Sequence, residues 1–199
     1  MKKPPKNPVL RRLHDLYERM DQAYAASAGA IGLSCAGCKD SCCETMFRHH
    51  THVEWTDLSQ GLAELPEARR QEVRENAETW LRIHQGALPG TSPRVPCPLS
   101  LEREGDLVCG LYNHRPMVCR LHGVPNVLIR PDGGRAAFPG CERAQNLAKT
   151  CEPALLDRTP LLTELARLEM DLLGRSRAGR ALRVDLTIAE MILMGPPKL

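Results

Sequence analysis

The segment CAGCKDSCC, nine residues with four cysteines, constrains this chain more than any other part of its sequence. The chain's cysteines are Cys35, Cys38, Cys42, Cys43, Cys97, Cys109, Cys119, Cys141 and Cys151. An odd number of thiols, four of them crowded together, argues against a disulfide framework. A nucleophilic cysteine needs a neighbouring base but no further thiols. Metal binding is the interpretation that accounts for the clustering, because thiolates are strong ligands for zinc and for iron–sulfur clusters.

The adjacent pair Cys42 and Cys43 limits how the segment can bind metal. Neighbouring side chains point to opposite faces of a strand and lie about 100° apart on a helix. Two adjacent sulfurs therefore reach one centre only with difficulty, so we expect them to serve different centres or one of them to be buried. Two arrangements are therefore possible: one cluster with spare packing cysteines, or two centres of four sulfurs each. Gly37, inside the CxxC turn, permits a positive φ.

The second cysteine-rich segment runs from residue 95 to residue 123 and predicts a β-hairpin. Residues 99–103 and 107–112 are expected to form two strands, joined by a turn at 104–106. Such a hairpin would bring Cys97 and Cys109 close together.

The hairpin is followed by the turn NHRP and a predicted short helix. Pro116 can open a helix that carries Cys119. Arg115 and Arg120 flank this region, and guanidinium groups beside thiolates offset charge and donate hydrogen bonds. The alternative is that Arg115 and Arg120 are solvated on the protein surface.

The motif order CAGCKDSCC, PCPL, CGLYNHRPMVCR and a later cysteine resembles the YkgJ-type cysteine cluster family, over roughly Cys35 to Cys141. That family is described as a zinc- or iron-chelating domain. The resemblance implies that the metal ligands are Cys35, Cys38, Cys42, Cys43, Cys97, Cys109, Cys119 and Cys141. Cys151 is expected to be a packing or spare thiol. Flagellin lysine N-methylases are longer and contain a similar cluster, which makes methyl transfer a distant alternative.

The ligand pattern favours a 4Fe–4S cluster over zinc. Structural zinc sites commonly take their cysteines as two CxxC-like pairs, whereas most of these cysteines come singly from separated segments. Imidazole also binds zinc and iron, so histidines are additional candidate ligands. These are His49, His50 and His52 in FRHHTH, and His122. We expect a solvated or hydrogen-bonded connector there instead, because the thiols already fill the coordination sites.

Three function classes follow from a metal centre of this kind. The first is a redox or iron–sulfur protein, the second a zinc-stabilised module that binds a protein or RNA, and the third a cluster-dependent enzyme such as a methyltransferase. No catalytic residue stands out, and whether the protein is an enzyme stays open. Its partner or substrate is unidentified, and the scattered net charge of +3 does not favour nucleic acid. The sequence contains neither a secretory signal nor an apolar run of about 18 residues, which predicts a cytoplasmic protein with reduced thiols.

The predicted fold class is mainly α, with a small β-hairpin and irregular metal-bound loops, in a single domain. Only 4% of the residues are aromatic, so bound metal is expected to add folding free energy. The predicted organisation is a disordered basic tail (1–8), an N-terminal helix (9–34), a cysteine cluster domain (35–145) and a C-terminal helical extension (146–199). Further helices are expected from Thr51 to residue 65, from Pro66 to Gly86, from Pro153 to Leu173, and after Asp185 or Thr187.

Overall fold

A computed structural model describes residues 7–38, 42–88, 90–149, 155–174 and 183–199. The chain is mainly α with a minor β component, as the sequence predicts. It forms two compact units: unit 1 comprises Met1–Ala36 and Met117–Asp171, and unit 2 comprises Gly37–Pro116 and Leu172–Leu199. The predicted cysteine cluster domain, residues 35–145, contributes to both units. Most of the predicted disordered tail, residues 1–6, and also Cys151 lie outside the described residues.

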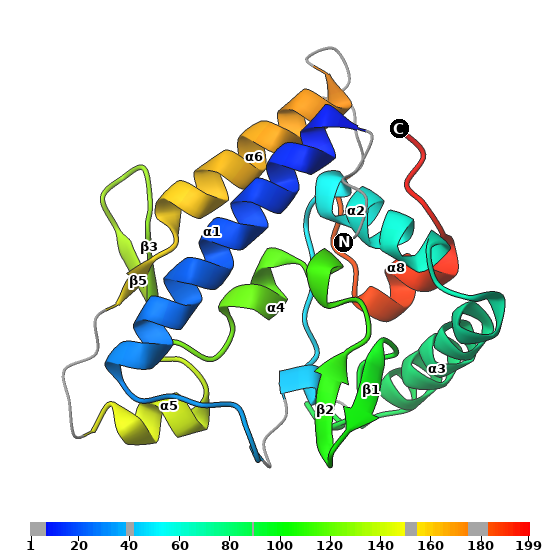
Figure 1. The fold of residues 1–199 in the computed structure, drawn as a ribbon, viewed down its shortest axis with the longest axis horizontal. Helices are drawn as coiled ribbons and strands as arrows, with labels where there is room; N and C mark the ends of the chain where they lie inside the picture. Colours follow the sequence, from blue (N-terminus) through cyan, green and yellow to red (C-terminus); the bar gives the residue numbers. More distant parts are fainter. Residues whose placement is uncertain (1–6, 39–41, 89, 150–154, 175–182) are drawn as a thin grey trace. The chain divides into compact units, whose positions relative to one another are not determined.

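Unit 1 is built on the long helix α1 (Pro8–Ala30). The side chain of Asn7 caps the helix by accepting a hydrogen bond from the backbone N–H of Val9, at 2.8 Å. The buried face of α1 consists of Leu10, Leu13, Leu16, Tyr17 and Met20. Helix α4 (Met117–Leu121) packs against α1, and α6 (Thr159–Leu173) lies alongside it (Figure 1).

A three-stranded sheet completes unit 1, and the sequence analysis missed it. Strand β3 (Asn126–Ile129) pairs antiparallel with β4 (Arg135–Phe138) and parallel with β5 (Leu156–Asp157). The helix predicted to begin at Pro153 was therefore placed too early, because residues 156–157 pair with β3 and α6 begins at Thr159. A two-residue strand is defined by its distant partner, and it leaves no periodic pattern in the local sequence.

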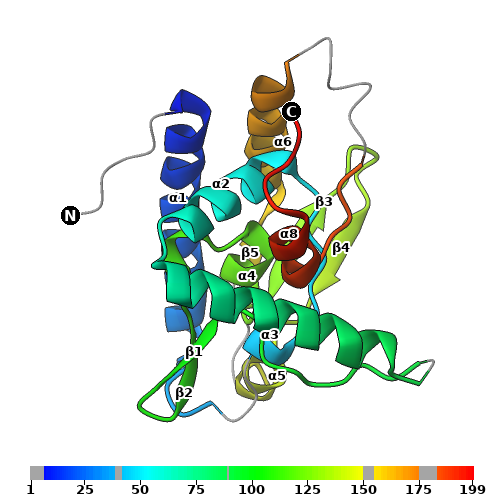
Figure 2. The same ribbon diagram turned by 90° about the vertical axis from the view of Figure 1, so that its right-hand side faces the viewer.

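Unit 2 buries an apolar core between three helices, α2 (His52–Ala63), α3 (Glu67–Gln85) and α8 (Ile188–Met194) (Figure 2). The predicted helix boundaries are confirmed at several caps. Thr51 caps α2, Pro66 and Gly86 flank α3, and Thr187 forms a full capping box with Glu190. These signals are readable from sequence because each cap depends only on residues within one helical turn.

The predicted hairpin is also present in unit 2. Strand β1 (Ser100–Arg103) pairs antiparallel with β2 (Asp106–Cys109). The first strand begins one residue later than predicted, and the second begins one residue earlier and ends at Cys109 instead of Tyr112. The turn is formed by Glu104 and Gly105, at φ of 52° and 84°. The hairpin is followed by the 3₁₀ turn η2 (Tyr112–His114). A second 3₁₀ turn, η1 (Cys42–Glu44), contains the adjacent cysteines of the CAGCKDSCC segment.

Candidate metal centre

Unit 2 brings three cysteines together from three separate segments. Cys43 lies in η1, Cys97 in the turn before β1, and Cys109 at the end of β2. The backbone N–H of Cys97 donates to the carbonyl oxygen of Cys43 at 2.7 Å. Ser100 lies opposite Cys109 in the hairpin, and its N–H and hydroxyl both donate to the carbonyl of Cys97, at 2.8 and 2.7 Å. We refer to Cys43, Cys97 and Cys109 as the unit 2 thiol group.

Burial dominates the electrostatics of the unit 2 thiol group at Cys97. Burial raises the pKa of Cys97 to about 12, the N–H of Leu99 lowers this pKa, and the nearby Cys109 and Cys43 thiolates raise it again. A Cys97 thiolate is therefore unfavourable there without a positive charge beside it. A metal ion supplies that charge, and a coordinating thiol is deprotonated outright.

The unit 2 thiol group borders the apolar core. Cys97 and Cys109 both pack against the core cluster that contains Trp55, Leu99 and Leu111. The backbone is tight next to Cys109, because a Cβ added at Gly110 would lie 2.8 Å from the carbonyl oxygen of Leu99. Water is thus kept away from one side of these two sulfurs.

The first cysteine motif is anchored to the hairpin by a contact that the sequence did not reveal. Gly37 has the positive φ expected of it, 63°. Its N–H donates to the Asp106 carboxylate at 3.3 Å, which places the chain just before Cys38 near the start of β2. Within η1, Cys42 is exposed and Cys43 half-buried. Neither of these adjacent thiols is fully buried, and whether they serve different centres stays a prediction.

In unit 1, two cysteines flank one tyrosine and one glycine. The Tyr24 hydroxyl lies 3.5 Å from the Cys35 sulfur, and a Cβ added at Gly123 would lie 3.1 Å from the same hydroxyl. The N–H of Cys141 donates to the Gly123 carbonyl oxygen at 3.1 Å. Cys119 also belongs to this unit, in α4. The sequence analysis found the cysteines but not the polar role of Tyr24.

The two arginines predicted beside the cluster have other contacts. Arg120 donates to the Asp21 carboxylate at 2.7 Å and lies over the Tyr17 ring, 3.9 Å from its centroid. Its side chain is 2% exposed, so it is not at the solvated surface. Arg115 lies 3.7 Å over the ring of Tyr112. A role for either arginine beside a metal centre stays a prediction.

The candidate histidine ligands lie in different surroundings. His49 is 1% exposed, and neither of its ring nitrogens has a hydrogen-bond partner among the described residues. Burial, followed by the neighbouring His50, lowers the pKa of His49 to about 4. His50 lies by the carbonyl of Val184, and His52 stacks on Trp55. The expected solvated or hydrogen-bonded connector is wrong for the His49 side chain, which is buried without a ring hydrogen bond among the described residues, and nothing here tests ligation by His50, His52 or His122.

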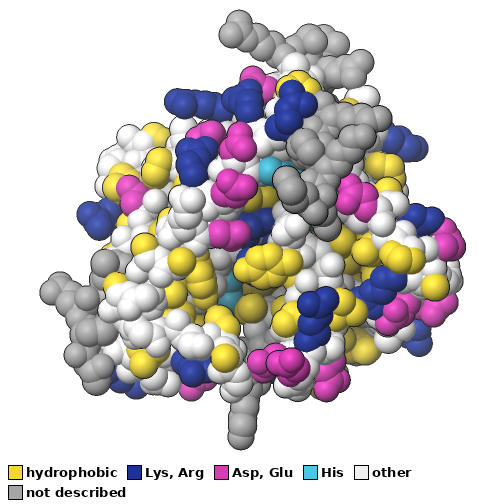
Figure 3. Space-filling model, in the orientation of Figure 1, with side chains coloured by type: hydrophobic (Ala, Val, Ile, Leu, Met, Phe, Trp, Pro, Cys, Tyr) yellow, Lys and Arg dark blue, Asp and Glu magenta, His cyan; other side chains and the backbone are white. Residues whose placement is uncertain are grey.

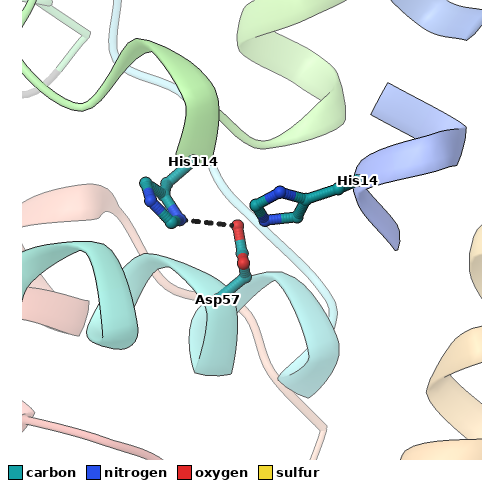
Figure 4. A group of neighbouring side chains, drawn as sticks. All are labelled: His14, Asp57 and His114. Carbon is teal, nitrogen blue, oxygen red and sulfur yellow. Dashed lines mark hydrogen bonds and ion pairs between the residues drawn. The ribbon is translucent and has the colours of Figure 1, made fainter. Parts of the chain in front are cut away.

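A buried histidine–carboxylate pair in unit 2 was missed by the sequence analysis. The Nδ1 atom of His114 lies 3.1 Å from Oδ2 of Asp57 (Figure 4). A Cβ added at Gly61 would lie only 2.6 Å from the His114 ring, so the glycine makes room for the imidazole against α2. The carboxylate fixes the orientation of the ring. No local pattern points to this pair, because its two residues are 57 positions apart in the sequence.

On the face that Figure 3 shows, neither basic nor acidic side chains form one continuous patch. Basic and acidic side chains are interspersed there with apolar ones. Among the described residues, every helix is too short or too polar to cross a membrane.

Comparisons of this chain with models of known families, with curated proteins and with solved structures found no match.

Proposed function

We propose that this chain binds an iron–sulfur cluster of the 4Fe–4S type through cysteine thiolates, with a redox or cluster-dependent role. The observation that carries this proposal is the unit 2 thiol group, in which the β1–β2 hairpin holds Cys97 near Cys109 and a backbone hydrogen bond ties Cys97 to the distant Cys43. Three neighbouring thiols are the kind of donor group that a shared metal centre requires.

The donor chemistry fits such a cluster. Iron–sulfur clusters are held by cysteine thiolates, and their potentials depend on solvent exposure and on hydrogen bonds to the sulfurs. Cys97 and Cys109 pack on apolar side chains, and the N–H of Leu99 is directed at the Cys97 sulfur. When bound, the cluster would supply one-electron chemistry. The chain would contribute the ligands, a water-excluding wall and this N–H donor.

The proposed ligand set is wider than the unit 2 thiol group. It includes Cys35, Cys38, Cys42, Cys43, Cys97, Cys109, Cys119 and Cys141. A reducing compartment such as the cytoplasm would keep these thiols available for metal.

A zinc-stabilised interaction module is the alternative, since structural zinc is bound by the same thiolates. Iron–sulfur is favoured because the members of the unit 2 thiol group come singly from η1, a turn and a strand end. A cluster-dependent methyltransferase rests on the family resemblance alone.

Metal and sulfide analysis of anaerobically purified protein tests the proposal. We expect iron and acid-labile sulfide in similar amounts, with a broad visible absorption that bleaches on reduction. Cys97→Ser and Cys109→Ser should each lose most of the bound iron. Cys151→Ser is the matched control and should retain it. A colourless protein with stoichiometric zinc would replace the proposal by its alternative, and a folded, metal-free protein would refute both.

A further inference from the structure

Two short segments of unit 2, far apart in the sequence, are joined by an antiparallel bridge. The N–H of His49 donates to the Leu186 carbonyl oxygen at 2.8 Å, and the N–H of Leu186 donates back to His49 at 3.1 Å. We refer to residues 48–50 and 184–186 together as the clasp. It lies just after the cysteine-rich segment on one side and just before α8 on the other.

Charged groups form the outer side of the clasp. Nε of Arg48 lies 2.6 Å from the Asp185 carboxylate, and Nδ1 of His50 lies 3.5 Å from the same carboxylate. These side chains are about half exposed or more. Arg48 holds the pKa of the Asp185 carboxyl below its usual range, chiefly by hydrogen bonding, so Asp185 stays ionised in mild acid.

The inner side of the clasp is His49, which is buried and lacks hydrogen-bond partners at both ring nitrogens among the described residues. A protonated imidazole here would be a buried cation with no acceptor. Its charged neighbours along the chain, Arg48 and His50, would repel it when both are protonated. The nearby acids are engaged elsewhere: Asp185 pairs with Arg48, and the Glu190 carboxylate accepts hydrogen bonds from Thr187. Burying an unpaired charge is strongly unfavourable.

The clasp holds a segment that covers part of the unit 2 core. Within it, α8 packs on α3 and α2, and the indole N–H of Trp55 donates to the Met191 carbonyl oxygen at 3.3 Å. Ile188 and Met191 are buried. We propose that the clasp is an acid-sensitive switch, in which protonation of His49 opens the bridge and releases residues 183–199 from α2 and α3.

The direction of the pH effect follows from proton linkage. Burial lowers the pKa of His49 from 6.5 to about 4 in the closed clasp. Between these two values the open state binds a proton that the closed state does not, so opening becomes more favourable as the pH falls. The opening equilibrium constant should rise by up to about tenfold per pH unit, on the order of 300-fold in total, and then level off. Above pH 6.5 it should be independent of pH.

Backbone hydrogen exchange in the full-length protein measures this opening directly. After correction for the intrinsic pH dependence of exchange, we expect protection across residues 186–194 to fall steeply from about pH 6.5 to about pH 4. His49→Leu should abolish the slope, and His49→Gln provides a second variant that cannot take up the proton. His52→Gln is the matched control on the same segment and should keep the wild-type slope.

A fourth variant separates the strength of the clasp from its pH response. Asp185→Asn removes the partner of Arg48, so opening should increase several-fold at neutral pH while the slope is unchanged. The switch is refuted if the His49 variants keep the wild-type slope, or if residues 67–85 lose protection together with residues 186–194. The inference does not depend on metal binding. Metal content measured in each sample distinguishes clasp opening from metal loss.

Discussion

Cys97 and Cys109 of unit 2 and Cys35 of unit 1 have different surroundings. In unit 2, Cys97 and Cys109 are part of the boundary of the apolar core, and a backbone hydrogen bond ties Cys97 to Cys43. In unit 1, Cys35 is exposed and its sulfur lies near the Tyr24 hydroxyl, while Cys141 directly precedes helix α5 (Glu142–Leu147). Cys97 and Cys109 therefore share their support with the core of unit 2, whereas the exposed Cys35 can change with little effect on packing.

This difference bears on how metal and folding are coupled. If the proposed cluster is bound through Cys97 and Cys109, a loss of core packing should weaken its binding, and the bound metal should add to the stability of the core. Matched substitutions, one in each unit, test whether the two units respond differently.

The largest effect is expected from leucines in the two cores. Leu58 in unit 2 is 1% exposed and Leu13 in unit 1 is fully buried. Leu58→Ala and Leu13→Ala should each lower the free energy of unfolding by about 2–5 kcal/mol, from lost transfer energy and the cavity left behind. Denaturant titration measures this loss.

The two leucine variants should differ in where exchange increases. Leu58→Ala should raise hydrogen exchange in α2, α3 and α8 and lower metal retention, because the unit 2 thiol group borders the same core. Leu13→Ala should raise exchange in α1 and α6. Equal metal retention in wild type and Leu58→Ala would contradict the coupling of core and ligands.

The next largest change in stability is expected from alanine substitution of two helical glycines, which should act in opposite directions. A Cβ at Gly61 would lie 2.6 Å from the His114 ring, so Gly61→Ala should destabilise the protein by about 1–3 kcal/mol through overpacking. Gly29 in α1 has no atom within 4 Å of an added Cβ. Gly29→Ala should therefore be neutral or stabilising by up to about 0.5 kcal/mol, since alanine loses less backbone entropy. Thermal unfolding compares the two, and a neutral Gly61→Ala would show that His114 can move.

How much of this arrangement the sequence predicts depends on the range of the interactions. The caps at Thr51 and Thr187, and the hairpin with its Glu104–Gly105 turn, follow from neighbours in the chain. The hairpin also accounts for Cys97 lying near Cys109. The bond from Cys97 to Cys43 joins distant segments, and no local pattern announces it.

The missed features are non-local in the same way. The sheet of unit 1 depends on pairing between residues 126–127 and 156–157. The Asp57–His114 pair joins a helix to a 3₁₀ turn from another part of unit 2. Such pairings are selected by packing, which overrides the weak preferences of short segments. Ion pairs on the surface show no local signal either, except within one helix.

Replacing a cysteine by serine tests whether the thiol that packs on the core, Cys97, matters more for stability than the exposed thiol of Cys35. In reduced protein from which metal has been removed, Cys97→Ser should cost about 1–3 kcal/mol, because a hydroxyl replaces a half-buried, weakly polar thiol that packs on the core. Cys35→Ser should stay within about 0.5 kcal/mol, as is usual for an exposed site. Chemical denaturation with a reductant and a chelator measures both. Equal effects would mean that burial does not distinguish the two thiols.

The smallest effect concerns ion pairs between α1 and α6. Arg12 lies 2.7 Å from Asp171 and Arg19 lies 2.6 Å from Glu164. All four side chains are about a third to a half exposed. Arg12→Ala and Arg19→Ala should therefore each cost less than about 1 kcal/mol, because solvent screens the attraction and two long side chains must be ordered.

Salt distinguishes this attraction from packing of the arginine stems on α6. The electrostatic part should largely vanish at about 1 M salt, where the Debye length is about 3 Å. Arg74→Ala in unit 2, which removes the local Arg74–Glu78 pair of α3, is the matched control. Double-mutant cycles at low and high salt measure each coupling. If the α1–α6 couplings persist at high salt while that of Arg74 disappears, packing of the stems joins these two helices, and unit 1, like unit 2, depends chiefly on apolar contact.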